Sequence, residues 1–286
     1  MRTIGGFLLA LLAVCGVYGQ RPSTGDTRVD FYARWSAQTS AIQSRQPAWA
    51  VPLVTTYTGL FQVVRTDITR QVAPARTATW NFDNSKGINL IVPGNLELAV
   101  DAPPYIEHNT KAVDGIGDFS FLVKYRIASG NEHHGSYTLS AFVLTTVPTG
   151  TYKNGSTNGS VTPTLGAGKG FGRLDVQSTL GATLPTGSPA TTASGRPIGW
   201  NTAVQYHIGK LFFPEVESNA TYYKGGANDG RAQEFLTPGI VIGKCALHPE
   251  RPQSRPGLAF GGGMQIATSR FHAYNHALIL TARWIY

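Results

Sequence analysis

The sequence is poor in cysteine and in charged residues. Only two cysteines occur among 286 residues, Cys15 and Cys245, and this excludes a disulfide-rich scaffold. Charged residues make up 14% of the chain, against about 25% in soluble domains, which argues against a surface of salt-bridged helices. The mean hydropathy is nevertheless only -0.10, so uncharged polar residues must replace the missing charges.

Long apolar runs are also missing after residue 19. Arg2 lies near the start, an apolar stretch covers 4–17, and the stretch ends at Val17-Tyr18-Gly19. This is the pattern of a cleaved secretory signal peptide, and the stretch is shorter than the about 20 residues of a membrane-spanning helix. A lipoprotein signal ending at Cys15 fits less well, because Val14 is larger than the residue such a site prefers. Without a later apolar run, the mature chain can enter a membrane only as a closed barrel.

Most of the mature chain alternates apolar and polar residues with a period of two. In 118–127 every second residue from Phe119 to Ile127 is apolar, and 96–101 and 173–184 follow the same scheme. Most candidate strands are about 10 residues long, the length of a tilted membrane-crossing strand. We expect twelve strands, near 59–71, 76–83, 88–102, 117–128, 135–147, 160–171, 173–184, 199–213, 215–224, 235–245, 257–268 and 274–286.

The connections between these strands should alternate between long and short, as in outer-membrane barrels. Long connections rich in polar residues and Gly or Pro are expected near 103–116, 148–159, 185–198 and 225–234. Short ones are expected at 83–86, at Gly172 and at Pro214, while 72–75 and 246–256 break the alternation.

We therefore predict an all-β protein, a transmembrane antiparallel up-and-down β-barrel of about 12 strands with a short N-terminal periplasmic segment. The expected parts are a signal peptide at 1–19, a lead-in or plug segment at 20–58 and the barrel at 59–286. One detail bears on the plug alternative: Gly166, Gly168 and Gly170 leave one face of a strand bare. Such a face suits either the close approach of a plug or sharp curvature of the barrel.

The C-terminal strand carries an assembly signal. The terminal Tyr286 shares one face with apolar residues at alternate positions, and this pattern resembles the signal that the barrel assembly machinery recognises. The residues assigned to it are Leu278, Leu280, Trp284 and Tyr286. The expected partners are this machinery, outer-membrane lipid and a small solute. No run of Lys or Arg suggests a nucleic-acid partner.

Several segments together resemble a known family. GIGDFSFLVKYRI at 115–127, LELAVDAPPYI at 96–106, TPTLGAGKGFG at 162–172 and TPGIVIGK at 237–244 resemble strands of outer-membrane proteins grouped with the MetA pathway of phenol degradation. The resemblance covers about residues 59–286. It implies a porin-like barrel of the Gram-negative outer membrane with a transport function, and it identifies no solute.

The inner faces of the predicted strands carry the residues that we expect to line the lumen. Charges of both signs on neighbouring strands form ion-pair ladders, which either close the lumen or tune the selectivity of a passage. The candidates are Glu97, Asp101, Asp118, Lys124, Arg126, Arg173, Asp175 and Gln177.

We expect no cofactor, no metal and no enzymatic activity. Glu132, His133 and His134 lie on one short turn without a partner motif, so a solvated turn is favoured over a metal site. GAGKG at 166–170 lacks the spacing and the following helix of a phosphate loop. A barrel-embedded hydrolase would need a serine beside a histidine base, and no motif joins one to the candidate bases His207, His248, His272 and His276.

The predicted function is an outer-membrane channel or transporter for a small solute, with hydrophobic and aromatic compounds included. Twelve strands enclose a lumen between the filled 8-strand barrels and the water-filled 16-strand porins. The alternatives are a secreted β-sandwich that binds sugars or surfaces, and the barrel-embedded hydrolase.

Overall fold

The computed structural model describes residues 27–187, 195–247 and 256–286. The proposed signal peptide at 1–19 and the candidate base His248 lie outside the described residues. Contacts divide the chain into two units, one ending at Ser40 and the other running from Ala41 to Tyr286. The helix α1, Thr27–Gln43, reaches across this boundary. No helix within the described ranges has both the length and the apolar character needed to cross a membrane.

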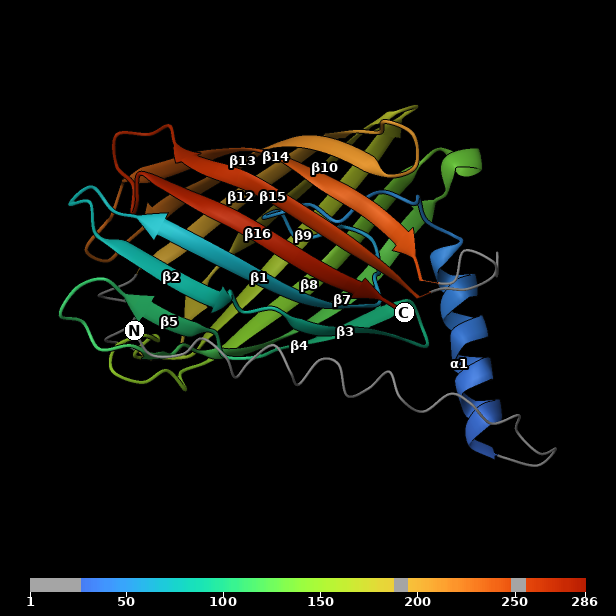
Figure 1. Cartoon of the computed structure of the whole chain (residues 1–286), viewed down its shortest axis with the longest axis horizontal. Coiled ribbons are helices and arrows are strands. Elements are labelled where there is room, and N and C mark those ends of the chain that lie inside the picture. Colours follow the sequence, from blue (N-terminus) through green and yellow to red (C-terminus); the bar gives the residue numbers. More distant parts are fainter. Residues whose placement is uncertain (1–26, 188–194, 248–255) are drawn as a thin grey trace. The chain divides into compact units, whose positions relative to one another are not determined.

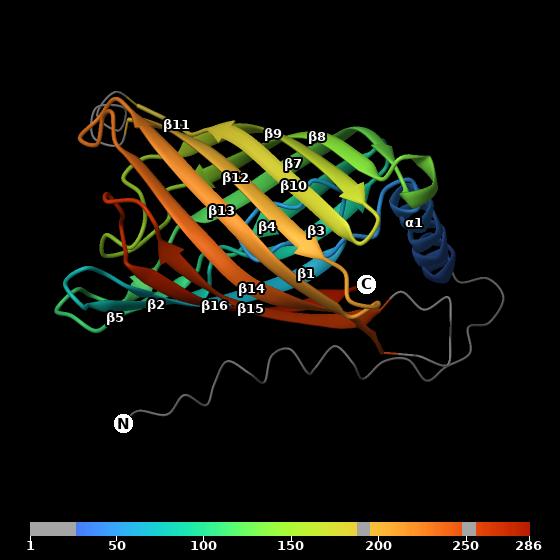
Figure 2. The same ribbon diagram turned by 90° about the horizontal axis from the view of Figure 1, so that it is seen from above.

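The second unit is a closed antiparallel barrel of twelve strands (Figures 1 and 2). Four of these strands consist of two segments each, namely β2 with β3, β4 with β5, β6 with β7, and β10 with β11. The segments are β1 Val63–Val72, β2 Ala78–Asp83, β3 Gly87–Val92, β4 Leu96–Asp101, β5 Tyr105–His108, β6 Gly115–Ile116, β7 Phe119–Gly130, β8 Tyr137–Val147, β9 Ser160–Phe171, β10 Leu174–Ala182, β11 Leu184–Pro185, β12 Arg196–Tyr206, β13 Phe212–Lys224, β14 Ala232–Ala246, β15 Gly257–Ala267 and β16 His276–Ile285.

The first and last strands close the ring. They pair antiparallel from Val63 opposite Ile285 to Val72 opposite His276. No sheet edge is left open at this seam, which a barrel in lipid requires. The prediction of an antiparallel barrel of twelve strands is therefore confirmed.

The alternation along β7 separates its two faces as predicted. Phe121, Val123, Tyr125 and Ile127 are 39–49% exposed on the outer face. The residues between them, Leu122, Lys124 and Arg126, are buried on the inner face. An apolar outer surface of this kind is expected of a barrel that contacts lipid.

The strand boundaries at 76–102 were predicted wrongly. The polar stretch 83–86 is a kink within one wall strand, because β1 pairs with both β2 and β3. Asp83, Asn84 and Ser85 all have positive φ there. The hairpin turn lies instead at 93–95, where Gly94 (φ 86°) and Asn95 (φ 61°) adopt the left-handed conformation. Gly-Asn is a recognised hairpin signal, but it was hidden inside an alternating apolar run.

Pro214 is likewise not a turn residue. It lies inside β13 and pairs with Ile240, while β12 and β13 are joined by residues 207–211. The pairing of β13 with β12 begins only at Glu215, so the missing N–H of Pro214 costs no ladder hydrogen bond on that side.

Candidate functional site: the occupied barrel lumen

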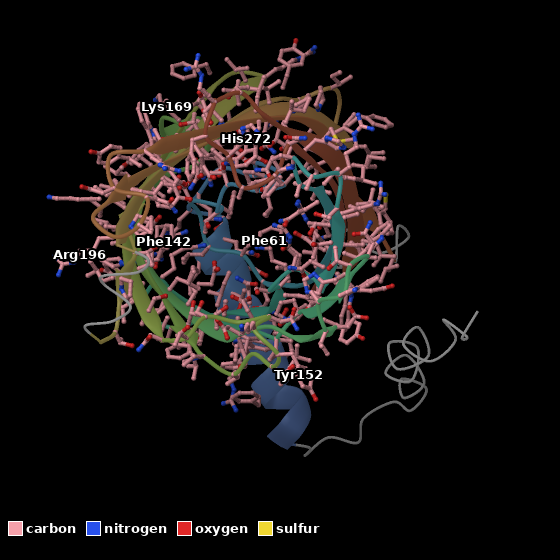
Figure 3. All side chains as sticks on the ribbon, turned by 90° about the vertical axis from the view of Figure 1, so that its left-hand side faces the viewer. Phe61, Phe142, Tyr152, Lys169, Arg196 and His272 are labelled. Carbon is pink, nitrogen blue, oxygen red and sulfur yellow. The ribbon has the colours of Figure 1, made fainter. Side chains whose placement is uncertain are left out.

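The chain preceding β1 passes through the inside of the barrel. We call residues 44–62 the lumen segment. It forms no regular strand or helix, yet most of its side chains are buried, including Trp49, Leu53, Tyr57 and Leu60. Figure 3, a view along the barrel, shows Phe61 inside the ring of strands. Buried backbone without sheet partners must form its hydrogen bonds elsewhere.

Two carboxylates on the inner face of β13 bind backbone N–H groups of the lumen segment. Glu217 accepts Val54 N at 2.7 Å and Thr55 N at 2.5 Å with its two oxygens, and Glu215 accepts Leu53 N at 3.0 Å. Both carboxylates are buried. Hydrogen bonds to a charged acceptor are about twice as strong as neutral ones, so this end of β13 fixes the middle of the segment.

An ion pair on the opposite wall binds the end of the segment. Lys124 of β7 and Glu97 of β4 are 3.0 Å apart, with side chains 2% and 1% exposed. The lysine also donates to Gly59 O at 3.1 Å, and the carboxylate accepts Phe61 N at 2.7 Å. The pair thus gives each of its charges a partner both in the wall and in the segment.

Arginines of β1 and β16, the strands that close the ring, bind carbonyl groups of the lumen segment. Arg283 of β16 donates to Val51 O and, at 2.9 Å, to Pro52 O. Arg65 of β1 donates to Pro52 O at 3.3 Å and to Leu53 O at 2.5 Å. The closing strands of the barrel are therefore joined to the segment on their inner side.

Glycines on the inner wall make room for the segment. A Cβ at Gly168 would lie 2.5 Å from the Trp49 ring and 2.8 Å from Thr58 Oγ1. On the other side of the lumen, a Cβ at Gly239 would lie 2.4 Å from Leu53 Cδ1. The bare face of β9 therefore accommodates the approach of the lumen segment.

Five of the sequence-predicted lumen residues lie together on the inner wall. They are at most 2% exposed, and they are Glu97, Lys124, Arg126, Asp175 and Gln177. Arg126 donates to Ile42 O and to Gln46 Oε1, both at 2.8 Å. Gln177 donates to Ala50 O at 3.3 Å. The structure thus brings four of the five to the segment itself, while Asp175 bonds to Gln177 and His207 of the wall.

The other three candidates lie at or beyond the strand ends. Asp101 is half-buried at the end of β4, on the same inner face as Glu97, and accepts Ser120 Oγ at 3.4 Å. Asp118 precedes β7 and accepts the N–H groups of Gly150 and Ser156, so it holds the loop after β8. Arg173 is exposed in the turn between β9 and β10. The alternating pattern was extended past the strand ends in the last two cases, where it no longer fixes the face.

Sequence reasoning missed four charged strand residues that bind the segment. They are Arg65, Glu215, Glu217 and Arg283. The available signal was the same alternation, because each is a charged residue on the inner face of a strand.

Three assembly-signal residues, Leu278, Leu280 and Trp284, lie on the outer face of β16, opposite the inward-facing Arg283, and Tyr286 directly follows the strand. Leu280 is 47% exposed, and Leu278, Trp284 and Tyr286 are half-buried. Their position leaves them accessible from outside the barrel wall.

Two of the candidate histidine bases, His207 and His272, bond to neighbouring polar groups. No group of three potential metal ligands occurs among the described residues. His207 pairs with Asp175 at 2.6 Å, and His272 bonds to Asn275 and to the backbone of Ser269. His276 is exposed at the start of β16.

The turn with the paired histidines has a different contact. Glu132 Oε1 accepts Ala48 N at 2.7 Å, and His134 Nδ1 lies 2.7 Å from Asn131 Oδ1. This turn therefore contacts the start of the lumen segment.

Comparison with known proteins gives one family and a common fold. Residues 53–242 match the family described as "Putative MetA-pathway of phenol degradation". The COG4313 outer membrane channel from Pseudomonas putida F1 has 15% sequence identity and a TM-score of 0.52, with 83% of this chain and 100% of that chain covered. The NanC porin has 11% identity and a TM-score of 0.48, covering 77% and 98%. None of the curated proteins matches the chain.

Proposed function

Because the chain belongs to the family of the MetA pathway of phenol degradation, we propose that it is an outer-membrane channel for a small solute, closed by its own lumen segment. The observation that carries this proposal is the row of buried charged side chains that bind the backbone of residues 44–62. Glu217 accepts from a main-chain N–H group of the segment, and Arg283 and Arg65 donate to its main-chain carbonyl groups. The segment can therefore leave without breaking any covalent or sheet structure of the barrel.

The proposed location is the outer membrane, supported by the signal-peptide pattern at 1–19 and the alternating apolar pattern of β16. The signal peptide at 1–19 directs export and is cleaved, and the barrel assembly machinery reads the outer face of β16. The apolar outer face then contacts lipid, where ionised groups are costly. This accounts for the low content of charged residues.

The inner-wall charges would serve two states of the channel. In the closed state they bind the lumen segment. Once the segment moves, the same residues line an aqueous route and favour some solutes over others. The family description refers to the degradation of phenol. A small aromatic solute would agree with that description.

A reversible lock tests whether the segment is the gate. Thr58 Oγ1 of the segment and Thr138 Oγ1 of β8 are 2.7 Å apart and buried. Cysteines at both positions would place two sulfurs near the 2.05 Å bond length of a disulfide. The Cys245→Ser background removes the exposed native thiol.

The measurement is conductance in planar bilayers before and after reduction. We expect Thr58→Cys with Thr138→Cys to be silent when oxidised and to conduct after dithiothreitol. Thr138→Cys alone is the control and should not respond. Equal conductance in both redox states would show that solute passage does not need the segment to move, and a barrel silent in both states would favour a structural role.

A further inference from the structure

Two cations lie directly opposite each other on the outer face of the barrel. Arg196, the first residue of β12, pairs in register with Lys224, the last residue of β13. Both side chains are exposed, and Figure 3 shows Arg196 on the outside of the ring of strands. Like charges that face each other across a strand pair destabilise the sheet, so an anion bound between them relieves this repulsion.

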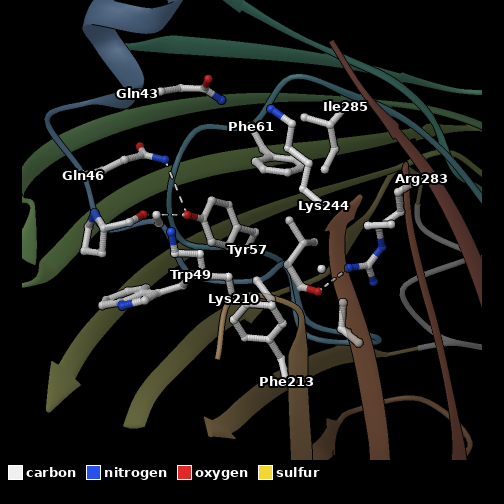
Figure 4. A pocket seen from close by; sticks show the side chains of 17 residues that line it. Gln43, Gln46, Trp49, Tyr57, Phe61, Lys210, Phe213, Lys244, Arg283 and Ile285 are labelled. Carbon is white, nitrogen blue, oxygen red and sulfur yellow. Dashed lines mark hydrogen bonds between the residues drawn. The ribbon is translucent and has the colours of Figure 1, made fainter. Parts of the chain in front are cut away.

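Neither cation is neutralised by the part of the chain that the structure describes. Arg196 and Lys224 take part in no hydrogen bond or ion pair among the described residues. Asp229, in the turn after β13, accepts a backbone N–H group of the same turn, and the sequence at 188–194 contains no acidic residue. The inner wall differs, because Arg283 donates to a carbonyl group of the lumen segment (Figure 4).

Aromatic side chains mark the membrane level of this pair. Tyr222 and Trp200 lie on the same outer face, further along the same two strands, and are 47% and 62% exposed. Exposed Tyr and Trp form girdles at the membrane interfaces of outer-membrane barrels. Cations that lie beyond such a girdle, towards the strand ends, are at the level of the lipid headgroups.

The lengths of the connections indicate which leaflet the pair meets. At this end, 186–195 joins β11 to β12 and 225–231 joins β13 to β14. At the other end, 172–173 joins β9 to β10 and 207–211 joins β12 to β13. Outer-membrane barrels have short periplasmic turns and longer extracellular loops. The pair therefore faces the outer leaflet, whose lipid in Gram-negative bacteria is the phosphate-bearing lipopolysaccharide.

An apolar groove begins beside the pair on the same outer face. Its volume is about 610 Å³, and residues of β7 to β12 line it, among them Leu165, Leu180 and Ile198. None of the described residues that line it is charged. Ile198 follows Arg196 by two positions along β12, which is about 7 Å along a strand. A hydrocarbon chain gains free energy in such a groove by burial of apolar area.

We propose that Arg196 and Lys224 bind a phosphate group of lipopolysaccharide, and that the groove holds one of its acyl chains. The planar guanidinium group suits two parallel hydrogen bonds to phosphate oxygens, and the ammonium group adds a charge-assisted bond from the neighbouring strand. The inference rests on the outer-membrane location in the proposed function, and it adds a lipid partner that solute passage does not require.

Lipid binding can be measured apart from conductance. The full chain, purified in detergent, is titrated by native mass spectrometry with diphosphorylated lipid A, the membrane anchor of lipopolysaccharide, with phosphate-free lipid A and with phosphatidylglycerol. We expect the diphosphorylated form to bind about tenfold more tightly than either, because it alone offers both the phosphate groups and several acyl chains. Equal affinity for the phosphate-free form would overturn the role of the cations, and equal affinity for phosphatidylglycerol would overturn the assignment to lipopolysaccharide.

Variants with the heat-modified migration of the parent then locate the site. Arg196→Gln with Lys224→Gln should weaken binding of diphosphorylated lipid A about tenfold, and an undiminished affinity would overturn the site. The matched control is Lys169→Gln with Arg173→Gln, which removes the same charge from exposed residues at the other end of the barrel and should leave the affinity unchanged. Ala182→Phe fills the groove and should also weaken binding; an unchanged affinity would remove the acyl chain from the groove.

The outcomes separate this inference from the channel proposal. A conducting outer-membrane barrel whose lipid affinity ignores Arg196 and Lys224 would retain the channel and reject the site. Site-dependent lipid binding by a barrel that never conducts would retain the site and reject the channel. A parent protein that is absent from outer membranes would reject the location and the site together.

Discussion

Replacing Glu217 by Gln should open the channel by weakening its hold on the lumen segment. The carboxylate accepts two N–H groups, from Val54 at 2.7 Å and Thr55 at 2.5 Å. A glutamine of the same shape offers one oxygen and turns an NH₂ group towards the other N–H. The variant therefore keeps the volume of the side chain and loses at least one charge-assisted hydrogen bond.

The size of the effect follows from these two bonds. A hydrogen bond to a charged group contributes about 1.5–3 kcal/mol, and a buried donor left unpaired costs about 1–3 kcal/mol. We expect the closed state to lose about 3 kcal/mol relative to the open state. Since every 1.4 kcal/mol changes an equilibrium constant tenfold, the open fraction should rise about 100-fold while it remains small.

Single-channel recording in planar bilayers measures the open fraction directly. The matched control is Glu234→Gln, because Glu234 is exposed on β14 and accepts Ser218 Oγ at 3.0 Å without touching the segment. Its open fraction should equal that of the parent protein. A correctly folded Glu217→Gln barrel with an unchanged open fraction would refute the assignment of Glu217 as a holder of the gate.

Three further predictions concern the wall and one loop. Gly168→Val should displace the lumen segment and raise conductance, while Gly199→Val should not, because a Cβ at Gly199 meets no atom within 4 Å. Lys124→Gln leaves Glu97 buried without its ion-pair partner, at a cost of about 3–5 kcal/mol. The temperature at which the barrel unfolds, seen as the change in its gel migration on heating, should therefore fall. Adding Glu97→Gln should restore much of the lost thermal stability. Asp118→Ala removes the acceptor of two loop N–H groups, so limited proteolysis should cut the loop after β8 faster while barrel migration stays the same.

The wall of the barrel could be read from the sequence where the alternation was uninterrupted. Along β7 the residues from Phe121 to Arg126 fall on the predicted faces, because a strand places successive side chains on opposite sides. The prediction failed at 83–86, where three residues in the left-handed conformation kink a continuous strand. Polar residues of the same kinds also form the turns that end strands. Local sequence does not decide between a kink and a turn; the pairing of β1 with β2 and β3 decides it.

The contacts of the lumen segment could not be predicted in the same way. Leu53 and Glu215 are 162 positions apart, and Phe61 and Glu97 are 36 apart. No period in the sequence relates such pairs, because one partner lies in an irregular backbone. The glycines of β9 were the indirect signal, since they showed a bare strand face without showing that Trp49 would occupy it.

The direct continuation of the lumen segment into β1 has a kinetic consequence. Gln62 ends the segment and Val63 begins the strand that seals the ring against β16, so no linker separates the closing element from its receptor. A segment that leaves the lumen stays tethered at its mouth, at an effective concentration that for short flexible links is about millimolar. Reclosure is then a first-order process, equally fast in a crowded membrane and at a single isolated barrel.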